Sequence, residues 1–370
     1  MLRKINISIF VLIFLLALGV DAVNATPYLS TNYYCLVDTD TGQVIYSQGL
    51  DEKRPVASTT KMMTAILAVE YANLDEVAIV SEHASKTPEF SIGLRKGSEV
   101  EVAELVKAAL IRSSNDTAVV LAEHIAGDES LFAHLMNKKA FAIGAVNTHF
   151  INSSGLPATN HYSTTYDLSV IGRYLLTKEE PRKIVAMAES TFQHPDYIKP
   201  LKISTTNRLL NNYSGANGIK TGTTNLAGKC LVASATRDGR NLIAVTLKSG
   251  DRVGDCMRLL DYGFYNTKYV KIIDGQIPFK RLKVNNGEKP YMEVYPSQDL
   301  YLWQADNKLD LEKKVRINYM PEVPVLKGTI HGYLDVYVDN KLMKSIPLVN
   351  RENIKKKNNT IQKIREFLIK

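Results

Sequence analysis

Residues 28–268 have strand-like sequence near both ends and a helical pattern in between. Residues 28–47 contain two apolar, β-branched runs joined by a turn, which predicts a hairpin. Two further runs, at 229–236 and 241–247, flank the hairpin dipeptide Asp238-Gly239. This order of elements predicts an antiparallel sheet covered by helices, with a mainly helical insertion.

Helical periodicity fills the middle of this segment, where apolar residues recur every three or four positions. The predicted helices cover residues 58–72, 102–125 with a break near Ser113, 131–143, 166–176 and, after the last strands, 257–264. The predicted fold class of this part is therefore a mixture of α and β, of the α/β or α+β kind.

The pattern changes at about residue 269 to short alternating runs separated by turn dipeptides. These dipeptides are Asn286-Gly287, Asp306-Asn307 and Asp339-Asn340, and they predict a small all-β domain. A chain of 370 residues is also long for a single core. We expect one domain at 26–268 and a second at 269–350.

The N-terminus has the pattern of an export signal. Arg3 and Lys4 precede an uncharged run, Ile7 to Val20, that is short for a membrane span. Val23-Asn24-Ala25 then supplies small residues for cleavage, so residues 1–25 are predicted to be a signal peptide. The alternative is a retained N-terminal anchor.

The last 20 residues carry most of the net charge. Residues 351–370 hold seven basic and two acidic side chains, or +5 (7 − 2), of the chain's net charge of +8. The rest is close to neutral, which does not support a nucleic-acid-binding face.

Apolar and basic residues of this tail are arranged at helical spacing. The apolar positions are Ile354, Ile361, Ile364, Phe367 and Leu368, and the basic ones are Lys355, Lys356, Lys357, Lys363, Arg365 and Lys370. Such a segment is typical of an anchor on an anionic membrane surface. We expect residues 351–370 to attach the protein to the outer leaflet of the cytoplasmic membrane. The alternative is a solvated terminus.

Cysteine and histidine usage indicates neither a disulfide framework nor a metal site. Cys35, Cys230 and Cys256 are odd in number and lack metal-ligand spacing, so they are expected to be small core residues. No H-E-x-x-H pattern occurs among the seven histidines. No cofactor or metal is predicted.

The motif S-x-x-K occurs once, with Ser58 at a predicted helix start and Lys61 one turn later. Their side chains share a helical face, where the lysine can activate the serine as a base. A lysine is a base only when it is neutral, which requires burial and a second nearby cation. Taken alone, the motif is equally compatible with an N-capping serine.

Two further motifs supply the other groups that such a site needs. Ser113-Ser114-Asn115 lies where the helical pattern breaks, and its serine can relay a proton while its asparagine holds an amide. Lys220-Thr221-Gly222 precedes a strand and offers a cation, a hydroxyl and an unobstructed backbone to a carboxylate. Ser30-Thr31-Asn32 and Lys248-Ser249-Gly250 have similar spacing, but Lys248 precedes a plain turn, so Lys220 is preferred.

The order of these motifs is that of class A β-lactamases and penicillin-binding proteins. The stretch from about Tyr34 to Lys268 resembles the low-molecular-weight penicillin-binding D-alanyl-D-alanine carboxypeptidases. The intervening sequence also matches, in His149-Phe150, Ser154-Gly155-Leu156, His161-Tyr162-Ser163, Asp167-Leu168, Thr206-Asn207-Arg208 and residues 231–236. The Ser58 to Ser113 interval is shorter than in enterobacterial members, so the loop bordering the site is the least certain part of the match.

The resemblance implies a β-lactamase/transpeptidase-like fold and a serine-type carboxypeptidase that acts in the cell wall. Such an enzyme removes the terminal D-alanine from peptidoglycan stem pentapeptides through an acyl-enzyme, and β-lactams inhibit it covalently. The resemblance further implies that the β-domain is a stalk between membrane and wall.

Residue roles follow from the same resemblance, one position at a time. Ser58 would be the nucleophile, Lys61 the general base and Ser113 the proton relay. The substrate would be held by Asn115, Lys220, Thr221, Gly222, Thr223 and Arg252, with the backbone N–H groups of Ser58 and Thr223 facing the oxyanion. The alternative for Arg252 is an ordinary surface arginine.

Three other functions share parts of this pattern. A β-lactamase requires an E-x-x-x-N-type loop, and Glu179-Glu180-Pro181-Arg182-Lys183 offers no matching asparagine. A transpeptidase or D,D-endopeptidase differs only in the acceptor, and the sequence does not separate it. A non-catalytic wall-binding protein is disfavoured because Ser58, Lys61 and Lys220 are all present.

Overall fold

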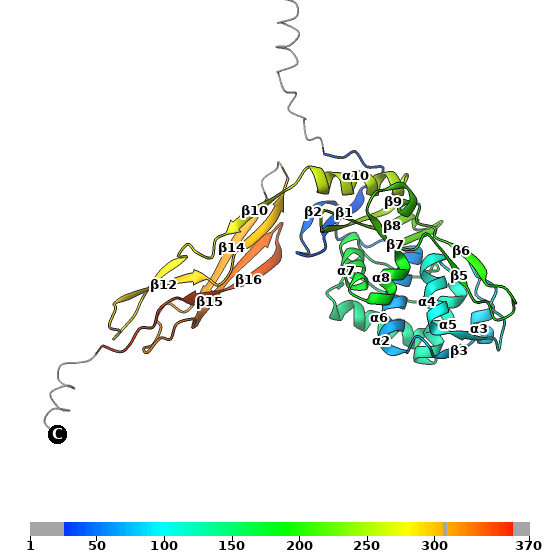
Figure 1. Cartoon of the computed structure of the whole chain (residues 1–370), viewed down its shortest axis with the longest axis horizontal. Helices are drawn as coiled ribbons and strands as arrows, with labels where there is room; N and C mark the ends of the chain where they lie inside the picture. The colour runs from blue at the N-terminus through cyan, green and yellow to red at the C-terminus, as the bar shows by residue number, and fades with distance from the viewer. Residues whose placement is uncertain (1–25, 306–308, 358–370) are drawn as a thin grey trace, which may run out of the picture.

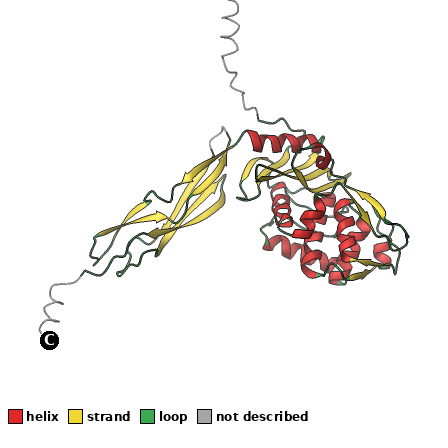
Figure 2. Ribbon diagram, viewed as in Figure 1, coloured by secondary structure: helices red, strands yellow, loops and turns green. Residues whose placement is uncertain are grey.

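A computed structural model describes residues 26–305 and 309–357 of the chain. All the helices of this described part lie in one lobe, together with a central sheet (Figures 1 and 2). The second lobe is elongated, contains only strands and follows helix α10 along the chain (Figure 2). The predicted mixture of α and β, followed by an all-β region, is confirmed.

The central sheet of the first lobe is antiparallel, with strand order β2-β1-β9-β8-β7. Its strands are β1 (Tyr33–Asp38), β2 (Val44–Gln48), β7 (Ala216–Thr224), β8 (Gly228–Arg237) and β9 (Arg240–Ser249). The hairpin from the start of the segment therefore pairs with strands from its end, as the sequence predicts. Both residues of the Asp238-Gly239 turn have positive φ, as a two-residue hairpin turn requires.

Each face of this sheet is covered by helix. Helix α7 (Thr165–Leu176) packs on β1 and β9 from one side, and α10 (Arg252–Tyr265) packs on β8 and β9 from the other. Along β9, Ile243 and Val245 belong to one core while Ala244 belongs to the other. Helix α10 begins earlier than the predicted residue 257, because Asp251 caps its first turn by accepting from the Gly254 N–H.

The helical insertion surrounds α2 (Lys61–Tyr71), which follows the short 3₁₀ helix η1 (Ala57–Thr60). Residues 61–68 are all buried, so α2 is covered on every side. Its neighbours are α4 (Val102–Ile111), α5 (Asn115–Ala126), α6 (Glu129–Ala142), α7 and α8 (Glu179–Val185). The break between α4 and α5 falls at 112–114, as predicted.

Several short elements of this lobe were not predicted, because each is too short to show a period. They are β3 (Val77–Ile79), α3 (Glu82–Ser85), β4 (Glu99–Glu101), β5 (Glu189–Phe192), β6 (Leu201–Ser204) and α9 (Leu209–Asn212). β3 pairs with β4, and β5 pairs with β6.

The second lobe contains a five-stranded sheet, β11-β12-β16-β15-β14, and a two-stranded one, β10-β13. The strands are β10 (Lys268–Ile273), β11 (Lys280–Lys283), β12 (Tyr291–Pro296), β13 (Leu300–Gln304), β14 (Leu311–Ile317), β15 (Ile330–Val338) and β16 (Lys341–Asn350). Its core is separate from those of the first lobe. Asp339-Asn340 forms the β15–β16 turn with positive φ at both residues, whereas Asp306-Asn307 lies outside the described residues.

The prediction that Ile354 belongs to the apolar face of a terminal helix is wrong. Ile354 is fully buried in the core of the β-domain, and its backbone pairs with Val325 in both directions. Lys356 likewise bridges to Gly287. The chain therefore stays in the β-domain through residue 357, because an aliphatic side chain beside a sheet gains more from core burial than from a separate helix. The other predicted tail residues, from Ile361 onward, lie outside the described residues.

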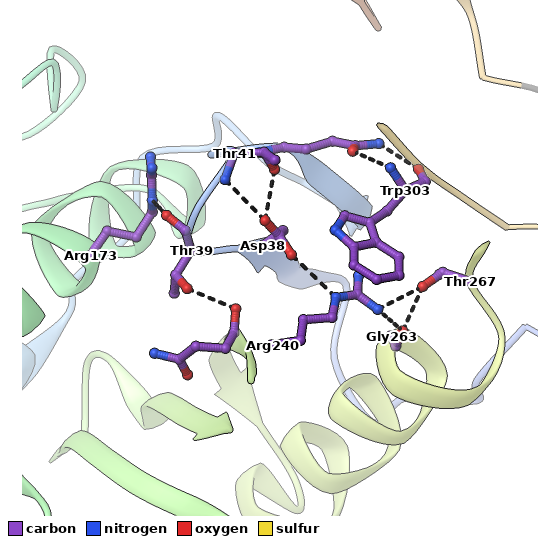
Figure 3. A network of polar contacts seen from close by, with 10 residues as sticks. Asp38, Thr39, Thr41, Arg173, Arg240, Gly263, Thr267 and Trp303 are labelled. Atoms are coloured by element: carbon purple, nitrogen blue, oxygen red, sulfur yellow. Dashed lines mark hydrogen bonds and ion pairs between the residues drawn. The ribbon is translucent and has the colours of Figure 1, made fainter. Parts of the chain in front are cut away.

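The two lobes meet at the side chain of Gln43, between β1 and β2. Its amide donates to the Trp303 carbonyl at 2.6 Å and accepts from the Trp303 N–H at 2.8 Å, so it pairs with β13 as another strand would. The Arg240 guanidinium stacks on the Trp303 ring and donates to Asp38 (Figure 3). These contacts join the sheet of the first lobe to the second.

Within residues 26–305 and 309–357, no helix is long and apolar enough to cross a bilayer. Nor does any group of three or more His, Cys, Asp and Glu side chains converge there. All three cysteines are buried in the first lobe, as small core residues.

Candidate active site

Ser58 and Lys61 face each other where η1 passes into α2. Ser58 lies in the 3₁₀ turn, and Lys61 is the first residue of the α-helix. Their Oγ and Nζ atoms are 3.0 Å apart, a hydrogen-bonding distance. The preceding Ala57 has φ +49°, and a non-glycine residue in this region is typical of strained functional sites.

The Lys61 amine is completely buried, and it contacts neutral groups rather than a carboxylate. Nζ donates to Asn115 Oδ1 at 2.6 Å and to the Ser154 carbonyl at 2.7 Å. Burial, and then the nearby Lys220 cation, hold the pKa of Lys61 well below its usual value. The two conditions that the sequence argument required of this lysine are both met.

The Ser113 loop forms a second wall. Ser113 has φ +68° and is buried, and Asn115 begins helix α5. The Asn115 amide nitrogen donates to the carbonyls of Pro88 and Glu89, which fixes its oxygen toward Lys61. The predicted Ser/Asn triplet is therefore a rigid loop rather than a solvated turn.

Lys220 lies on β7 and faces Ser113. Its Nζ donates to Ser113 Oγ at 2.8 Å and to the Thr221 carbonyl at 3.0 Å. Burial, and then the Arg252 cation, lower the pKa of Lys220 to about 7. Because a lysine donor leaves the serine proton free, Ser113 can still donate to a ligand.

Strand β7 passes so close to η1 that only glycine fits at position 222. A Cβ there would lie 2.7 Å from the Val56 carbonyl oxygen and 3.0 Å from the Ser58 nitrogen. The backbone of β7 thus lies directly beside the Ser58 amide. This approach is what a pair of oxyanion-binding N–H groups from Ser58 and Thr223 needs.

Arg252 is the first residue of α10 and closes the far end of the strand. Its Nη1 donates to the Gly222 carbonyl at 3.0 Å and to Thr223 Oγ1 at 2.8 Å. Thr221 Oγ1 makes a short contact with Thr206 Oγ1. Every predicted site residue is therefore brought to one edge of the sheet.

The two sequence look-alikes lie elsewhere. Ser30 bonds Asp255 beside α10, and Thr31 bonds the Leu247 carbonyl. Lys248 is exposed at the end of β9. The structure brings Lys220, and not Lys248, to Ser113.

Sequence reasoning gave no role to four residues that complete the site. The Ser154 carbonyl holds Lys61, and Gly155 packs so closely on η1 that a Cβ would lie 2.0 Å from the Ala57 carbonyl oxygen. His161 hydrogen-bonds Thr60 at 2.8 Å, and burial, followed by the charges of His149 and Lys61, lowers its pKa to about 4. Thr206 supports Thr221. All four lie in stretches that resemble the family, but the stretches gave no indication of their contacts.

A helix-flanked antiparallel sheet with a serine and two buried lysines at its edge defines the class of serine-acylating penicillin-binding enzymes. Comparison with known proteins specifies the family. A family model described as D-alanyl-D-alanine carboxypeptidase matches residues 21–250, and one described as the C-terminal domain of penicillin-binding protein 5 matches residues 268–356. The chain belongs to the D-alanyl-D-alanine carboxypeptidase family.

Individual relatives agree over most of the chain. It is 30% identical to D-alanyl-D-alanine carboxypeptidase DacF of Bacillus subtilis over 331 residues, covering 87% of this chain and 85% of the relative. It is 29% identical to DacA of Escherichia coli, and the alignment covers 90% of this chain and 85% of that relative. The crystal structure of penicillin-binding protein 5 from Haemophilus influenzae has a TM-score of 0.71 at 27% identity, covering 90% of this chain and 99% of that one.

These matches confirm the predicted family, fold and enzyme class. The protein is a serine-type D-alanyl-D-alanine carboxypeptidase, a hydrolase of the penicillin-binding group that acts on peptidoglycan stem peptides and is a target of β-lactams. The separate match of the C-terminal region also agrees with the all-β fold of the second lobe.

Proposed function

We propose that Ser58 is the nucleophile of this carboxypeptidase and that Lys61 is its general base. The observation that carries this assignment is the set of partners around Lys61 Nζ. Two of them, Asn115 Oδ1 and the Ser154 carbonyl, can only accept hydrogen bonds. A neutral amine donates two N–H bonds to them and turns its lone pair to the third partner, the Ser58 hydroxyl.

The reaction then proceeds in two steps, acylation of Ser58 and hydrolysis of the resulting ester. Lys61 takes the Ser58 proton as Oγ attacks the carbonyl carbon of the penultimate D-alanine. The peptide C–N bond breaks as Ser113 gives its proton to the leaving amine and receives the Lys61 proton in its place, so that D-alanine departs and Lys61 is neutral again. Water activated by the same amine then hydrolyses the ester, which releases the shortened peptide and regenerates Ser58.

The remaining residues hold the substrate in this proposal. Lys220, Thr221 and Arg252 form a cationic, hydroxyl-bearing edge that suits the terminal carboxylate. Asn115 binds the peptide amide, and the Ser58 and Thr223 N–H groups stabilise the oxyanion. Gly222 keeps the strand close enough for both.

We also propose where the enzyme is located, and this proposal rests on the sequence. We infer that residues 1–25 direct export, that residues 26–268 form the catalytic domain and that the β-domain extends to residue 357. The basic residues Lys363, Arg365 and Lys370 would then attach the protein to the outer leaflet. This revises the predicted tail, which began at residue 351.

D-alanine release from a pentapeptide ending in D-Ala-D-Ala tests the assignment. We expect residues 26–357 to release D-alanine, and Ser58→Ala and Lys61→Ala to release none while remaining folded by circular dichroism. A Ser58→Ala variant that still releases D-alanine or is labelled by fluorescent penicillin would refute the nucleophile. If the parent binds penicillin at Ser58 but releases no D-alanine, the acceptor is another peptide rather than water.

A further inference from the structure

A cavity lies between the two lobes, away from Ser58. Its volume is 480 Å³, within the range of small-ligand sites. One wall comes from the β1–β2 hairpin and α7, and the other comes from the β15–β16 turn.

Hydrogen-bond donors gather on the α7 side of this cavity. The Arg173 Nε donates to the Thr39 carbonyl at 2.9 Å (Figure 3), which fixes the guanidinium. Within the described residues, its two terminal nitrogens have neither a carboxylate nor a carbonyl partner, and the hydroxyls of Tyr166 and Ser47 have no hydrogen bond. Several donors without acceptors therefore face one space.

The hairpin is shaped to admit the guanidinium. Gly42 has φ +74°, and a Cβ on it would lie 2.6 Å from Arg173 Nη1. The clearance at Gly42 therefore matches the observed position of the guanidinium.

The β-domain contributes a second cation and an anion. Lys341 Nζ lies 3.4 Å from the centroid of the Tyr166 ring and 3.2 Å from Asp51 Oδ1, which ties the β15–β16 turn to α7. The Asp339 carboxylate forms no ion pair with any described residue. Apolar side chains, including Val44, Leu50 and Leu342, line the space alongside the polar groups.

From this arrangement we propose that the cavity binds a short peptide through its free C-terminal carboxylate. The carboxylate contacts the Arg173 guanidinium and the hydroxyls of Tyr166 and Ser47, while Asp339 faces a cationic group and the apolar wall takes the side chains. A small inorganic anion would satisfy the donors but would leave most of 480 Å³ and the apolar wall unused. The ligand touches both lobes, so its binding stabilises their relative placement.

Calorimetry with Nα-acetyl-L-lysyl-D-alanine and its C-terminal carboxamide tests the site. Protein acylated by excess penicillin is used, so that Ser58 is blocked. We expect one equivalent of the acid to bind and to raise the Tm, and the carboxamide to bind at least about tenfold more weakly. Absence of binding, or equal binding of acid and amide, overturns the proposal.

Variants locate the binding. Tyr166→Phe keeps the ring beneath Lys341 and removes only the hydroxyl, so we expect about tenfold weaker binding without loss of folding. Arg173→Gln should weaken it further, and the exposed Arg182→Gln should leave it unchanged. Unchanged affinity in both Tyr166→Phe and Arg173→Gln would place the peptide elsewhere and overturn the proposal.

Inorganic phosphate distinguishes a peptide site from a general anion site. We expect phosphate to compete only at concentrations far above those of the peptide acid, because it has no contact with the apolar wall. If phosphate binds as tightly as the peptide, the peptide assignment is wrong. Because the site is separate from Ser58, failure of penicillin to label the protein would count against the catalytic assignment alone, and the same titrations would be read on unlabelled protein.

Discussion

Two pairs of cations, one pair in each lobe, have opposite surroundings. Lys61 and Lys220 in the catalytic lobe are completely buried, and they bond to hydroxyl and carbonyl oxygens. Lys271 and Arg316 in the β-domain are solvent-exposed and bond to the carboxylates of Asp299 and Asp335. The first pair has lowered pKa values, whereas the carboxylate partners raise the pKa of the second pair.

This contrast separates cations that serve catalysis from cations that form surface ion pairs. A buried amine without a counter-ion is costly, so the fold tolerates it where a neutral or readily deprotonated lysine is useful. An exposed ion pair costs little and contributes little. Substitutions in each lobe should therefore separate activity from stability in opposite ways.

The largest effect is expected for Lys61→Met. Removal of the base should lower D-alanine release by about 10³-fold or more. The unfolding free energy should change by less than about 1 kcal/mol. The variant loses the hydrogen bonds of the amine, but it also no longer has the free-energy cost of burying a polar amine. Steady-state release and urea unfolding measure the two quantities. Loss of several kcal/mol together with activity would show that Lys61 is a structural residue.

Gly222→Ala should reduce activity next most strongly. The new Cβ would lie 2.7 Å from the Val56 carbonyl oxygen, so β7 must move away from η1. A shift of this kind displaces the oxyanion donors, and we expect about 10²-fold lower kcat with folding retained. Gly275→Ala in the β-domain, where the nearest atom is at 3.2 Å, is the control and should retain full activity. Equal kcat in the two variants would contradict the close approach.

Lys220 should make stability depend on pH. Its pKa is about 7 in the folded protein and 10.5 ordinarily, so between these values the unfolded chain binds the extra proton. Unfolding free energy should therefore rise with pH across this window, by up to about 1.4 kcal/mol per pH unit from this group. Below pH 7 the protonated, buried amine exerts its full destabilising effect.

The comparison with Lys220→Met measures this contribution together with the accompanying rise of the Lys61 pKa, since the Lys220 cation is one of the causes that lower it. The difference in unfolding free energy between parent and variant, measured by urea unfolding at several pH values, should shift in favour of the parent as pH rises from 7 to 10.5. A difference that stays constant with pH would mean that Lys220 keeps an ordinary pKa.

The sequence predicted only those parts of this site that depend on short spacings along the chain. Ser58 and Lys61 are one turn apart, and the helix break at Ser113 is visible as a lost period, so both could be placed without a structure. The Ser154 carbonyl reaches Lys61 from 93 residues away, and a backbone oxygen has no sequence pattern. Its role depends on tertiary packing alone.

Long-range contacts of the fold were equally beyond prediction from the sequence. Periodicity predicted the sheet and the main helices, but it could not show that Gln43 pairs with Trp303 across 260 residues. It also assigned Ile354 to a terminal helix, because one isoleucine among lysines fits a helical face as well as it fits the end of a β-domain. The burial of Ile354 against Val325 decides between them.

The smallest effect is expected for Arg316→Met in the β-domain. Arg316 donates to both oxygens of Asp335 at 2.8 and 3.1 Å, which would suggest a strong interaction. The arginine side chain is 67% exposed, however, so water and salt screen its charge, and the Asp335 side chain, which is only 8% exposed, keeps its hydrogen bond with Ser345. We expect D-alanine release to be unchanged and the Tm to shift by about 2 °C or less. A large loss of stability here, with none in Lys61→Met, would reverse the contrast between the lobes. The ion pairs of the β-domain would then stabilise the fold, and the buried amines would not.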